Sequence, residues 1–314
     1  MLRLVGGGGS VKLGVLSGPQ NCSYDDLRRL WRLADDSGFY SVHIWDHFFA
    51  SPSLDGSGAC FEGVSALTAL ALETKNVRVG SLVFCMSFRH PAVLAKAAVT
   101  IDHISKGRLE LGLGAGWYEM EYKAFGIPFA PAKHRLDLLD EGVQVIRSMF
   151  HEEETNFSGQ QFDIHNAYCS PRPLQHSPRI WIGGGGERRT LRIAAKYADG
   201  WNAAYVSPTV YKHKADVLDS WCDKEGRDPG DILRSVNLHF LMGIDRESAN
   251  RKRQEAIDQG QFDGALTGRP ADVIEQIERY ADAGAQEVNI ALRGAPFDWE
   301  AVQAFVEEVL PKFS

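Results

Sequence analysis

The pair Asp46–His47 is the strongest candidate for chemistry in the sequence. It directly follows residues 42–45, a short apolar run that predicts a β-strand, so it stands where a strand ends. A histidine, whose ordinary pKa is about 6.5, can pass a proton at neutral pH or hydrogen-bond a cofactor ring. We therefore predict that Asp46 and His47 are catalytic residues. A loop histidine that binds a backbone carbonyl group is the alternative.

The chain contains a second copy of this dipeptide, Asp102–His103, which serves as an internal comparison. The second copy lies in or just after a predicted helix, where we expect it to face solvent or to cap the helix. Position in the fold, rather than composition, therefore distinguishes Asp46–His47.

Four consecutive glycines, Gly183, Gly184, Gly185 and Gly186, lie between a predicted strand and a predicted helix that runs to Lys196. Glycine lets backbone N–H groups approach phosphate oxygens, and a helix N-terminus adds a favourable dipole. The segment is neither a Walker loop nor a Gly-x-Gly-x-x-Gly fingerprint. We predict that it binds an anion; a plain flexible turn is the alternative.

Polar residues also follow Gly114 and Gly116, the two glycines after the predicted strand 109–113. Glu119, Glu121 and Tyr122 either form a polar wall of a pocket or the first turn of a helix, where carboxylates are favoured in any case. No carboxylate cluster has the spacing of metal ligands, so we predict no metal site. A serine hydrolase is disfavoured because the chain lacks Gly-x-Ser-x-Gly.

These residues need elements that bring them together, and the chain alternates strand-like and helix-like segments. The predicted strands are residues 11–17, 42–45, 77–84, 109–113, 179–182, 200–204, 236–242 and 288–292. Eight strands, each followed by a helix, predict an α/β fold, a single (β/α)8 TIM barrel; a doubly wound sheet is the rival. In such a barrel the active site lies at the carboxyl ends of the strands.

We expect residues 1–10, which include Gly6 to Gly9, to form a flexible N-terminus, and residues 11–314 to form the barrel as one domain. Two segments interrupt the alternation, and we expect both as insertions at the C-terminal mouth. Residues 152–178 predict a hairpin and loop, and residues 243–268 predict a polar, mobile excursion.

Composition restricts the class of partner. The 314 residues are 44% hydrophobic and 24% charged, with 34 Lys and Arg against 41 Asp and Glu. An acidic chain without a basic cluster is a poor candidate for nucleic acid or an anionic membrane. Neither a membrane-spanning run nor a secretory signal is evident. The five scattered cysteines favour a reducing cytoplasm. We expect a cytoplasmic protein that acts on a small molecule.

Four stretches together resemble the luciferase-like monooxygenase superfamily, and especially its coenzyme F420-dependent oxidoreductase branch. They are Ser41 to Phe48, Ser87 to Pro91, Gly107 to Trp117 and Ile182 to Glu187, in matching order over nearly the whole chain. The resemblance implies a (β/α)8 barrel with an insertion region that binds F420 or, alternatively, FMN at its C-terminal mouth. It also implies a homodimer.

The resemblance implies roles for particular residues. It places Asp46 and His47 close to the deazaflavin ring, and it gives the four glycines to the cofactor phosphate. A bulge with a non-prolyl cis peptide at Leu82, Val83 and Phe84 would lie behind the ring. The other cofactor-binding residues that we expect are Ala115, Gly116 and Glu119. The aromatic residues Trp45, Phe48, Phe84 and Trp117 either line the pocket or belong to the core.

One departure from the branch bears on the substrate. Some sugar-phosphate dehydrogenases of this branch carry a catalytic glutamate just after the strand-four glycines, where this chain has Trp117. The resemblance therefore favours hydride transfer to an apolar or electron-poor substrate over sugar-phosphate oxidation. The alternatives are a two-component FMN-dependent monooxygenase and a flavin- or deazaflavin-binding protein without turnover.

Overall fold

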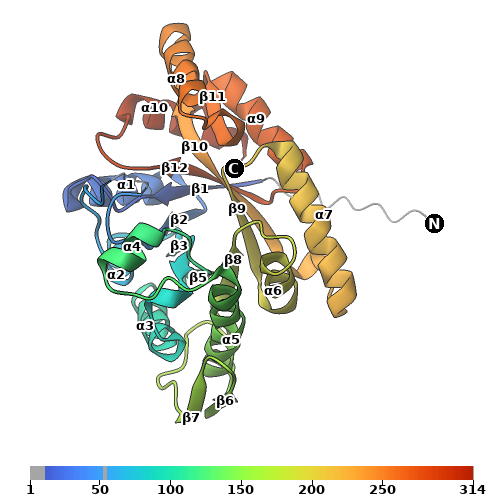
Figure 1. Cartoon of the computed structure of the whole chain (residues 1–314). Helices are drawn as coiled ribbons and strands as arrows, with labels where there is room; N and C mark the ends of the chain where they lie inside the picture. The colour runs from blue at the N-terminus through green and yellow to red at the C-terminus, as the bar shows by residue number, and fades with distance from the viewer. Residues whose placement is uncertain (1–10, 52–54, 314) are drawn as a thin grey trace.

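The computed structural model describes residues 11–51 and 55–313. The prediction of a flexible segment at residues 1–10, with Gly6 to Gly9, lies outside these described residues. Eight parallel strands form a closed barrel, which confirms the predicted TIM barrel (Figure 1). In order around the barrel they are β1 (Lys12–Ser17), β2 (Ser41–Ile44), β3 (Arg78–Ser81), β5 (Leu109–Gly114), β8 (Arg179–Gly183), β9 (Gly200–Ala204), β10 (Leu233–Met242) and β12 (Glu287–Leu292). The pairing of β12 with β1 closes the ring.

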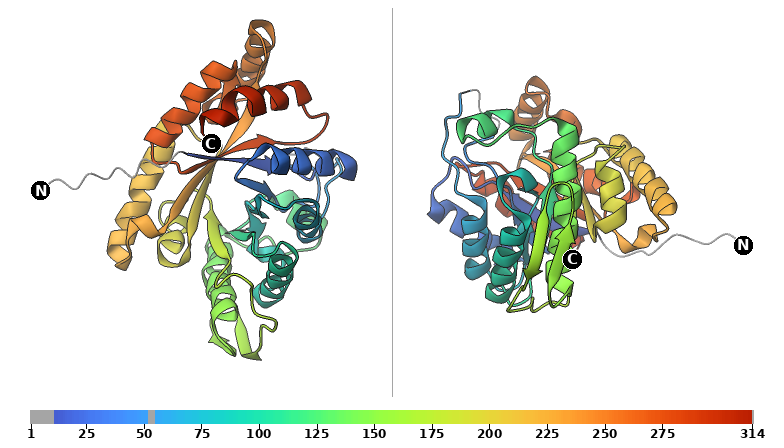
Figure 2. Two further views of the ribbon diagram at one scale, coloured as in Figure 1. Left: turned by 180° about the vertical axis from the view of Figure 1, so that it is seen from behind. Right: turned by 60° about the horizontal axis from the view of Figure 1, so that its bottom comes forward.

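Helices surround the strands in both views of Figure 2. Those that connect consecutive barrel strands are α1 (Tyr24–Ser37), α2 (Gly63–Glu73), α3 (Pro91–Ile104), α5 (Ala132–His151), α6 (Thr190–Tyr197), α7 (Pro208–Glu225) and α9 (Pro270–Asp282). After β12, α10 (Trp299–Ala304) continues as a π-helical turn, Phe305–Val309. No helix among the residues with described coordinates is long and apolar enough to cross a bilayer.

The boundaries of α1 show how local sequence sets an element. Ser23 caps the helix and forms a capping box with Asp26, whose backbone N–H lies 3.1 Å from the Ser23 hydroxyl. Gly38 ends the helix in the left-handed conformation, with a φ of 86°. The face between these caps buries Leu27 and Trp31 against the barrel.

The predicted strand 77–84 is divided in the structure. The barrel strand β3 ends at Ser81, and β4 (Phe84–Cys85) pairs with the end of β5. Between them the peptide bond Leu82–Val83 is cis, which confirms the non-prolyl cis peptide expected at this place. The chain therefore turns at the mouth of the barrel before it enters α3.

The hairpin predicted within residues 152–178 is confirmed, but its predicted location is wrong. It consists of the antiparallel strands β6 (Thr155–Ser158) and β7 (Asp163–Ala167). It connects the end of α5 to the start of β8 and so lies at the amino-terminal end of the barrel, opposite the mouth.

Asp102, in the second Asp–His pair, is buried, and its carboxylate accepts the backbone N–H of Leu174 at 2.7 Å, in the loop that follows the hairpin. The expectation that this pair faces solvent is therefore wrong for Asp102.

The second insertion follows a barrel strand and therefore lies on the side of the mouth. It contains the helix α8 (Arg246–Asp258) and the strand β11 (Ala265–Gly268) in place of an irregular excursion. The strand β10 has ten residues: its first part pairs with β9 and β12 in the barrel, and its end pairs with β11. The insertion extends the sheet beyond the barrel wall.

Candidate active site

A cavity of about 540 Å³ opens at the carboxyl ends of the barrel strands. Eight of the residues predicted for the site line it: Asp46, His47, Leu82, Val83, Ala115, Gly116, Gly183 and Gly184. They come from the loops that follow β2, β3 and β5 and from the end of β8. The closed barrel thus brings the predicted segments to one cavity, whose walls are mainly apolar and aromatic.

The four other predicted residues do not line this cavity. Phe84 is 1% exposed and packs in the core beneath it. Glu119 is exposed and forms an ion pair with Lys123 at 2.8 Å. Gly185 and Gly186 continue the glycine segment outward from Gly184. Among the predicted aromatic residues, Trp45 and Trp117 reach the cavity, whereas Phe48 does not.

The sequence analysis named Glu121 only as a possible wall of the pocket or a residue of a helical turn, and the structure shows that its carboxylate holds His47. Nδ1 of His47 lies 2.8 Å from Oε2 of Glu121, and Oε1 of Glu121 accepts the backbone N–H of Phe48 at 2.6 Å. Glu121 is 1% exposed. A carboxylate only accepts hydrogen bonds, so Nδ1 carries the donated proton and Nε2 is left for a ligand. Both residues line the cavity.

The short helix α4 (Glu119–Ala124) decides which glutamate reaches His47. Gly116 precedes it with a φ of +77°, and a Cβ there would lie 2.0 Å from the hydroxyl of Tyr122. Only glycine fits this turn. The turn sets the phase of α4 so that Glu121 points inward and Glu119 points outward.

Both carboxylate oxygens of Asp46 accept hydrogen bonds from other residues of the protein. Its carboxylate accepts the backbone N–H of Cys85 at 3.0 Å and two bonds from Arg89, at 2.6 and 2.9 Å. Arg89 also pairs with Glu62, which caps α2. These carboxylates raise the pKa of Arg89 above its ordinary value, against the effect of burial. Asp46 therefore joins the end of β2 to the segment after β3, and it offers no carboxylate oxygen to His47.

Glycines of two strands make room for Val83 on the cavity wall. A Cβ at Gly114 would lie 2.6 Å, and one at Gly183 would lie 2.7 Å, from a methyl group of Val83. Gly184 has a φ of +117°, which L-residues rarely adopt. Its N–H bonds to the carbonyl of Asn202 at 3.0 Å. The first glycine of the segment, Gly183, therefore packs against Val83. A turn at residues 187–189 separates the segment from α6.

The opposite wall contains a cation that the sequence analysis missed. Arg293 follows β12, and its guanidinium lies 5.7 Å from the ring centroid of Trp45 and 5.6 Å from that of Tyr205. Tyr205 in turn stacks on His239, with the ring centroids 4.0 Å apart. The sequence could have indicated this residue, because an arginine directly after the apolar strand 288–292 is expected at the barrel mouth.

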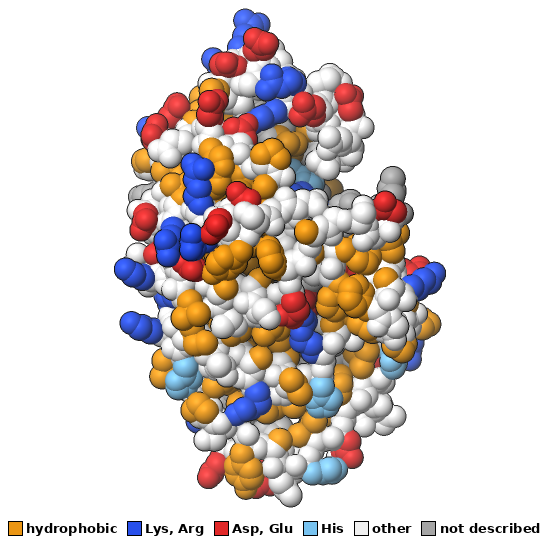
Figure 3. Space-filling model, turned by 90° about the vertical axis from the view of Figure 1, so that its left-hand side faces the viewer, with side chains coloured by type: hydrophobic (Ala, Val, Ile, Leu, Met, Phe, Trp, Pro, Cys, Tyr) orange, Lys and Arg blue, Asp and Glu red, His pale blue; other side chains and the backbone are white. Residues whose placement is uncertain are grey.

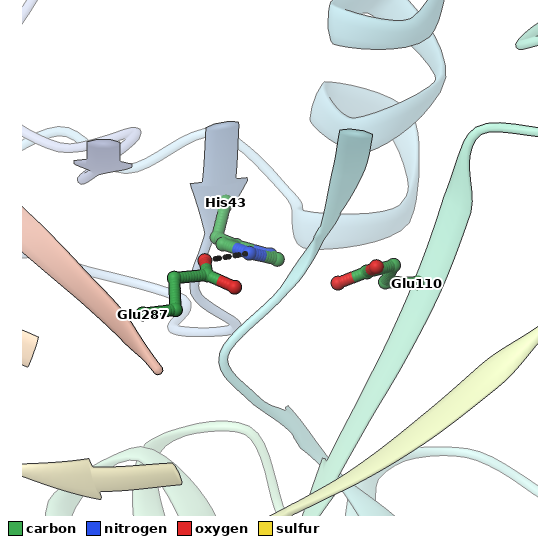
Figure 4. A group of neighbouring side chains, drawn as sticks. All are labelled: His43, Glu110 and Glu287. Carbon is green, nitrogen blue, oxygen red and sulfur yellow. Dashed lines mark hydrogen bonds and ion pairs between the residues drawn. The ribbon is translucent and has the colours of Figure 1, made fainter. Parts of the chain in front are cut away.

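His43, Glu110 and Glu287 approach one another inside the barrel, near its amino-terminal end (Figure 4). His43 and His47 stand four residues apart, but only His47 reaches the cavity. The Glu110 carboxylate accepts bonds from Arg78, Arg179 and Trp181 at 2.9 to 3.0 Å. Two arginines balance its charge, so the group has the chemistry of a compensated polar core. His43 is buried.

Comparison with known proteins identifies the family of this chain. A family model described as luciferase-like monooxygenase matches residues 10–267. The chain belongs to this family. A curated relative, the F420-dependent glucose-6-phosphate dehydrogenase of Amycolatopsis mediterranei, is 26% identical over 96% of this chain and 98% of its own length.

Two solved structures share the fold of this luciferase-like protein. An F420-dependent secondary alcohol dehydrogenase in complex with an F420-acetone adduct has a TM-score of 0.84 and 18% identity, and covers 97% of this chain and 99% of its own. The oxygenating constituent of 3,6-diketocamphane monooxygenase from Pseudomonas putida, in complex with FMN, has a TM-score of 0.76 and 19% identity, and covers 97% and 99%. At these identities the two structures establish the fold alone.

Proposed function

We propose that this protein is an F420-dependent oxidoreductase that transfers a hydride between the deazaflavin and a small organic substrate. The observation that carries the proposal is the His47–Glu121 pair in a largely apolar cavity at the barrel mouth. The nearly full-length match to F420-dependent relatives supports the choice of cofactor.

The cavity suits a flavin-like group in size and in polarity. Its volume is within the range of small-molecule sites, and Leu82 and Val83 present apolar surface to a ring. Among the described residues, no carbonyl accepts the backbone N–H groups of Gly185 and Gly186. These N–H groups, beside Thr190 at the cavity edge, would hold the phosphate.

In this proposal the protein supplies orientation, a dry pocket and a proton. A bound reduced deazaflavin supplies hydride, and it does not readily reduce oxygen because carbon replaces N5 of its ring. His47 would hold or release a proton at Nε2 near the reacting atoms. Glu121 would fix the ring of His47, and the Asp46–Arg89 pair would position the loop that carries it.

The test is to titrate the cofactor-free protein with reduced F420 and with reduced FMN. We expect micromolar or tighter binding of F420, weaker binding of FMN, and loss of reduced-deazaflavin absorbance when an acceptor is added. Preferential binding of FMN, with oxygen-dependent product formation, would establish the monooxygenase alternative. Tight F420 binding without hydride exchange would identify a carrier.

We also propose that residues 11–314 act as one domain of a cytoplasmic homodimer. Apolar side chains gather in patches between charged groups on the face shown in Figure 3. On α2 and α3, Leu72 and Val93 are 69% and 64% exposed, and contact with a partner subunit would remove this apolar surface from water. Light scattering after size exclusion should give twice the 34.8 kDa mass of the chain.

A further inference from the structure

We propose that Arg293 forms an anion-binding subsite in the cavity, and that the substrate carries a carboxylate or another oxyanion that binds there. That the bound anion is a substrate rests on the proposed function, whereas the existence of the anion-binding subsite does not. The cation of the subsite, its aromatic walls and its place in the barrel each support the inference.

The charges of the cavity leave Arg293 without a counter-ion. Of the other charged lining residues, Asp46 pairs with Arg89, and Glu121 contacts His47. Arg293 takes part in no ion pair within the described ranges 11–51 and 55–313; its guanidinium donates a hydrogen bond to the carbonyl of Ser51, at 2.5 Å. A guanidinium is always charged, and a partly buried charge without a partner is costly. An anionic ligand would remove that cost.

The aromatic residues around Arg293 hold its guanidinium in place, and none of them carries a charge at pH 7. The rings of Trp45 and Tyr205 flank it. Stacking on His239 fixes the ring of Tyr205. Burial, and to a smaller extent the charge of Arg293, lower the pKa of His239 to about 4, so this imidazole is neutral at pH 7. The subsite therefore has one cation, whose planar fork suits a carboxylate.

The position of Arg293 separates this subsite from the proposed phosphate site. Around the barrel, β8 with its glycines and β12 with Arg293 are divided by β9 and β10. On the other side of Arg293, only β1 lies between β12 and β2, which leads to His47. A ligand that reached from Arg293 towards His47 would cross the apolar side chains of Leu16 and Trp45. The ligand class that fits is a small molecule with an apolar or unsaturated body and one terminal oxyanion.

The test compares the binding of two carboxylic acids with that of their methyl esters, because an ester keeps most of the shape of the acid but has no charge. Cinnamate and benzoate, each beside its methyl ester, are titrated by calorimetry into the protein saturated with oxidised F420. The variants are Arg293→Met, Arg293→Lys and, as a matched control on the outer surface of α1, Arg28→Met, whose partner is Asp25. Thermal unfolding of each variant verifies the fold.

We expect the acids to bind the wild type and the esters to bind at least tenfold more weakly. Arg293→Met should lose roughly 10- to 100-fold of the affinity for the acids and little for the esters, as expected for hydrogen bonds to a charged group. Arg293→Lys should retain part of the preference, and Arg28→Met all of it.

Three results would overturn the proposal. They are equal binding of acid and ester, no acid binding at millimolar concentration, and an unchanged preference for acids in Arg293→Met. If Arg293→Met instead weakens F420 binding by the same factor, the anion belongs to the cofactor, which also overturns a substrate subsite. Failure of the wild type to bind F420 contradicts the proposed function instead, and the acid–ester comparison can still be made without cofactor.

Discussion

His47 acquires a defined orientation from a residue 74 positions away in the chain. The carboxylate of Glu121 joins the ring of His47 to the backbone of Phe48, so the imidazole and its own loop are held by one buried group. A ring fixed at Nδ1 presents Nε2 in one direction, which a proton donor or acceptor needs. The residue-scale predictions therefore concern this pair.

The first prediction is that His47→Ala lowers turnover by roughly 10²- to 10⁴-fold, the usual range for loss of a general acid or base. The fold should survive, because the side chain lies at the cavity edge. His103→Ala is the matched control: His103 follows the same residue type, and its Nε2 donates to the carbonyl of Arg172 at 2.8 Å, away from the cavity. Steady-state assays with F420 measure both.

Equal losses in the two variants would indicate general destabilisation rather than chemistry. A weaker cofactor affinity with unchanged turnover at saturation would instead assign His47 to holding the cofactor.

The second prediction concerns Glu121→Gln, which keeps the shape of the side chain but removes its charge. The loss of a charge-assisted hydrogen bond to His47 should lower turnover by roughly 10- to 100-fold. Glu119→Gln, two residues earlier on the same short helix, should leave turnover unchanged because Glu119 is exposed and pairs with Lys123. The pH profile of turnover should shift only in Glu121→Gln; an unshifted profile would reduce Glu121 to a structural role.

At the scale of elements, the eight barrel strands could be predicted because each is an apolar run at the expected spacing. Helix α4 could not be resolved in the same way. A helix of six residues has too few positions to show a periodicity, so Glu119 and Glu121 are equivalent in the sequence. The turn at Gly116 and the packing of Tyr122 distinguish them, and both depend on contacts that the sequence does not display.

The partner of Asp46 was hidden for a related reason. Arg89 lies 43 residues away, just before α3, and reaches Asp46 only because β2 and the segment after β3 are neighbours in the barrel. The location of the 152–178 hairpin, in contrast, was available from the order of elements. A segment between a helix and the next strand lies at the amino-terminal end of a barrel.

The third prediction tests the glycine segment. Gly184→Val should weaken F420 binding by at least about tenfold, because a branched side chain at a φ of +117° strains the turn beside the exposed N–H groups. Gly226→Val is the control, since Gly226 also has a positive φ, of +70°, but lies at the end of α7 with nothing near its Cβ position. Fluorescence titration measures both affinities. Unchanged affinity in a folded Gly184→Val would make the glycines a plain turn.

At the scale of the whole molecule, the barrel separates two polar regions along its axis. The group around Glu110 and Glu287 near the amino-terminal end is internally compensated and closed to the cavity. The mouth instead combines a held imidazole with a guanidinium that has no ion-pair partner among the described residues, and the N–H groups of Gly185 and Gly186 lie just outside this apolar cavity.

The last prediction links the mouth to the stability of the whole molecule. His239 is 7% exposed, and its pKa is lowered to about 4 mainly by burial, from an ordinary value of 6.5. Between these pH values the unfolded chain binds more protons than the folded protein, so the free energy of unfolding falls as the pH falls. The full contribution is present above about pH 6.5. At pH 5 the loss from this one group should be about 2 kcal/mol.

Urea unfolding at pH 7.5 and pH 5.0 measures this loss. His239→Gln should be less stable at pH 7.5, because it loses the stacking on Tyr205, but its stability should fall less between the two pH values. His165→Gln is the control: the His165 side chain is 68% exposed, so its removal should leave the wild-type pH dependence intact. If His239→Gln and the wild type lost the same free energy of unfolding, His239 would have to accept a proton in the folded barrel as readily as in the unfolded chain. Its ring would then be open to water, which contradicts the packed Tyr205–His239 stack beside Arg293.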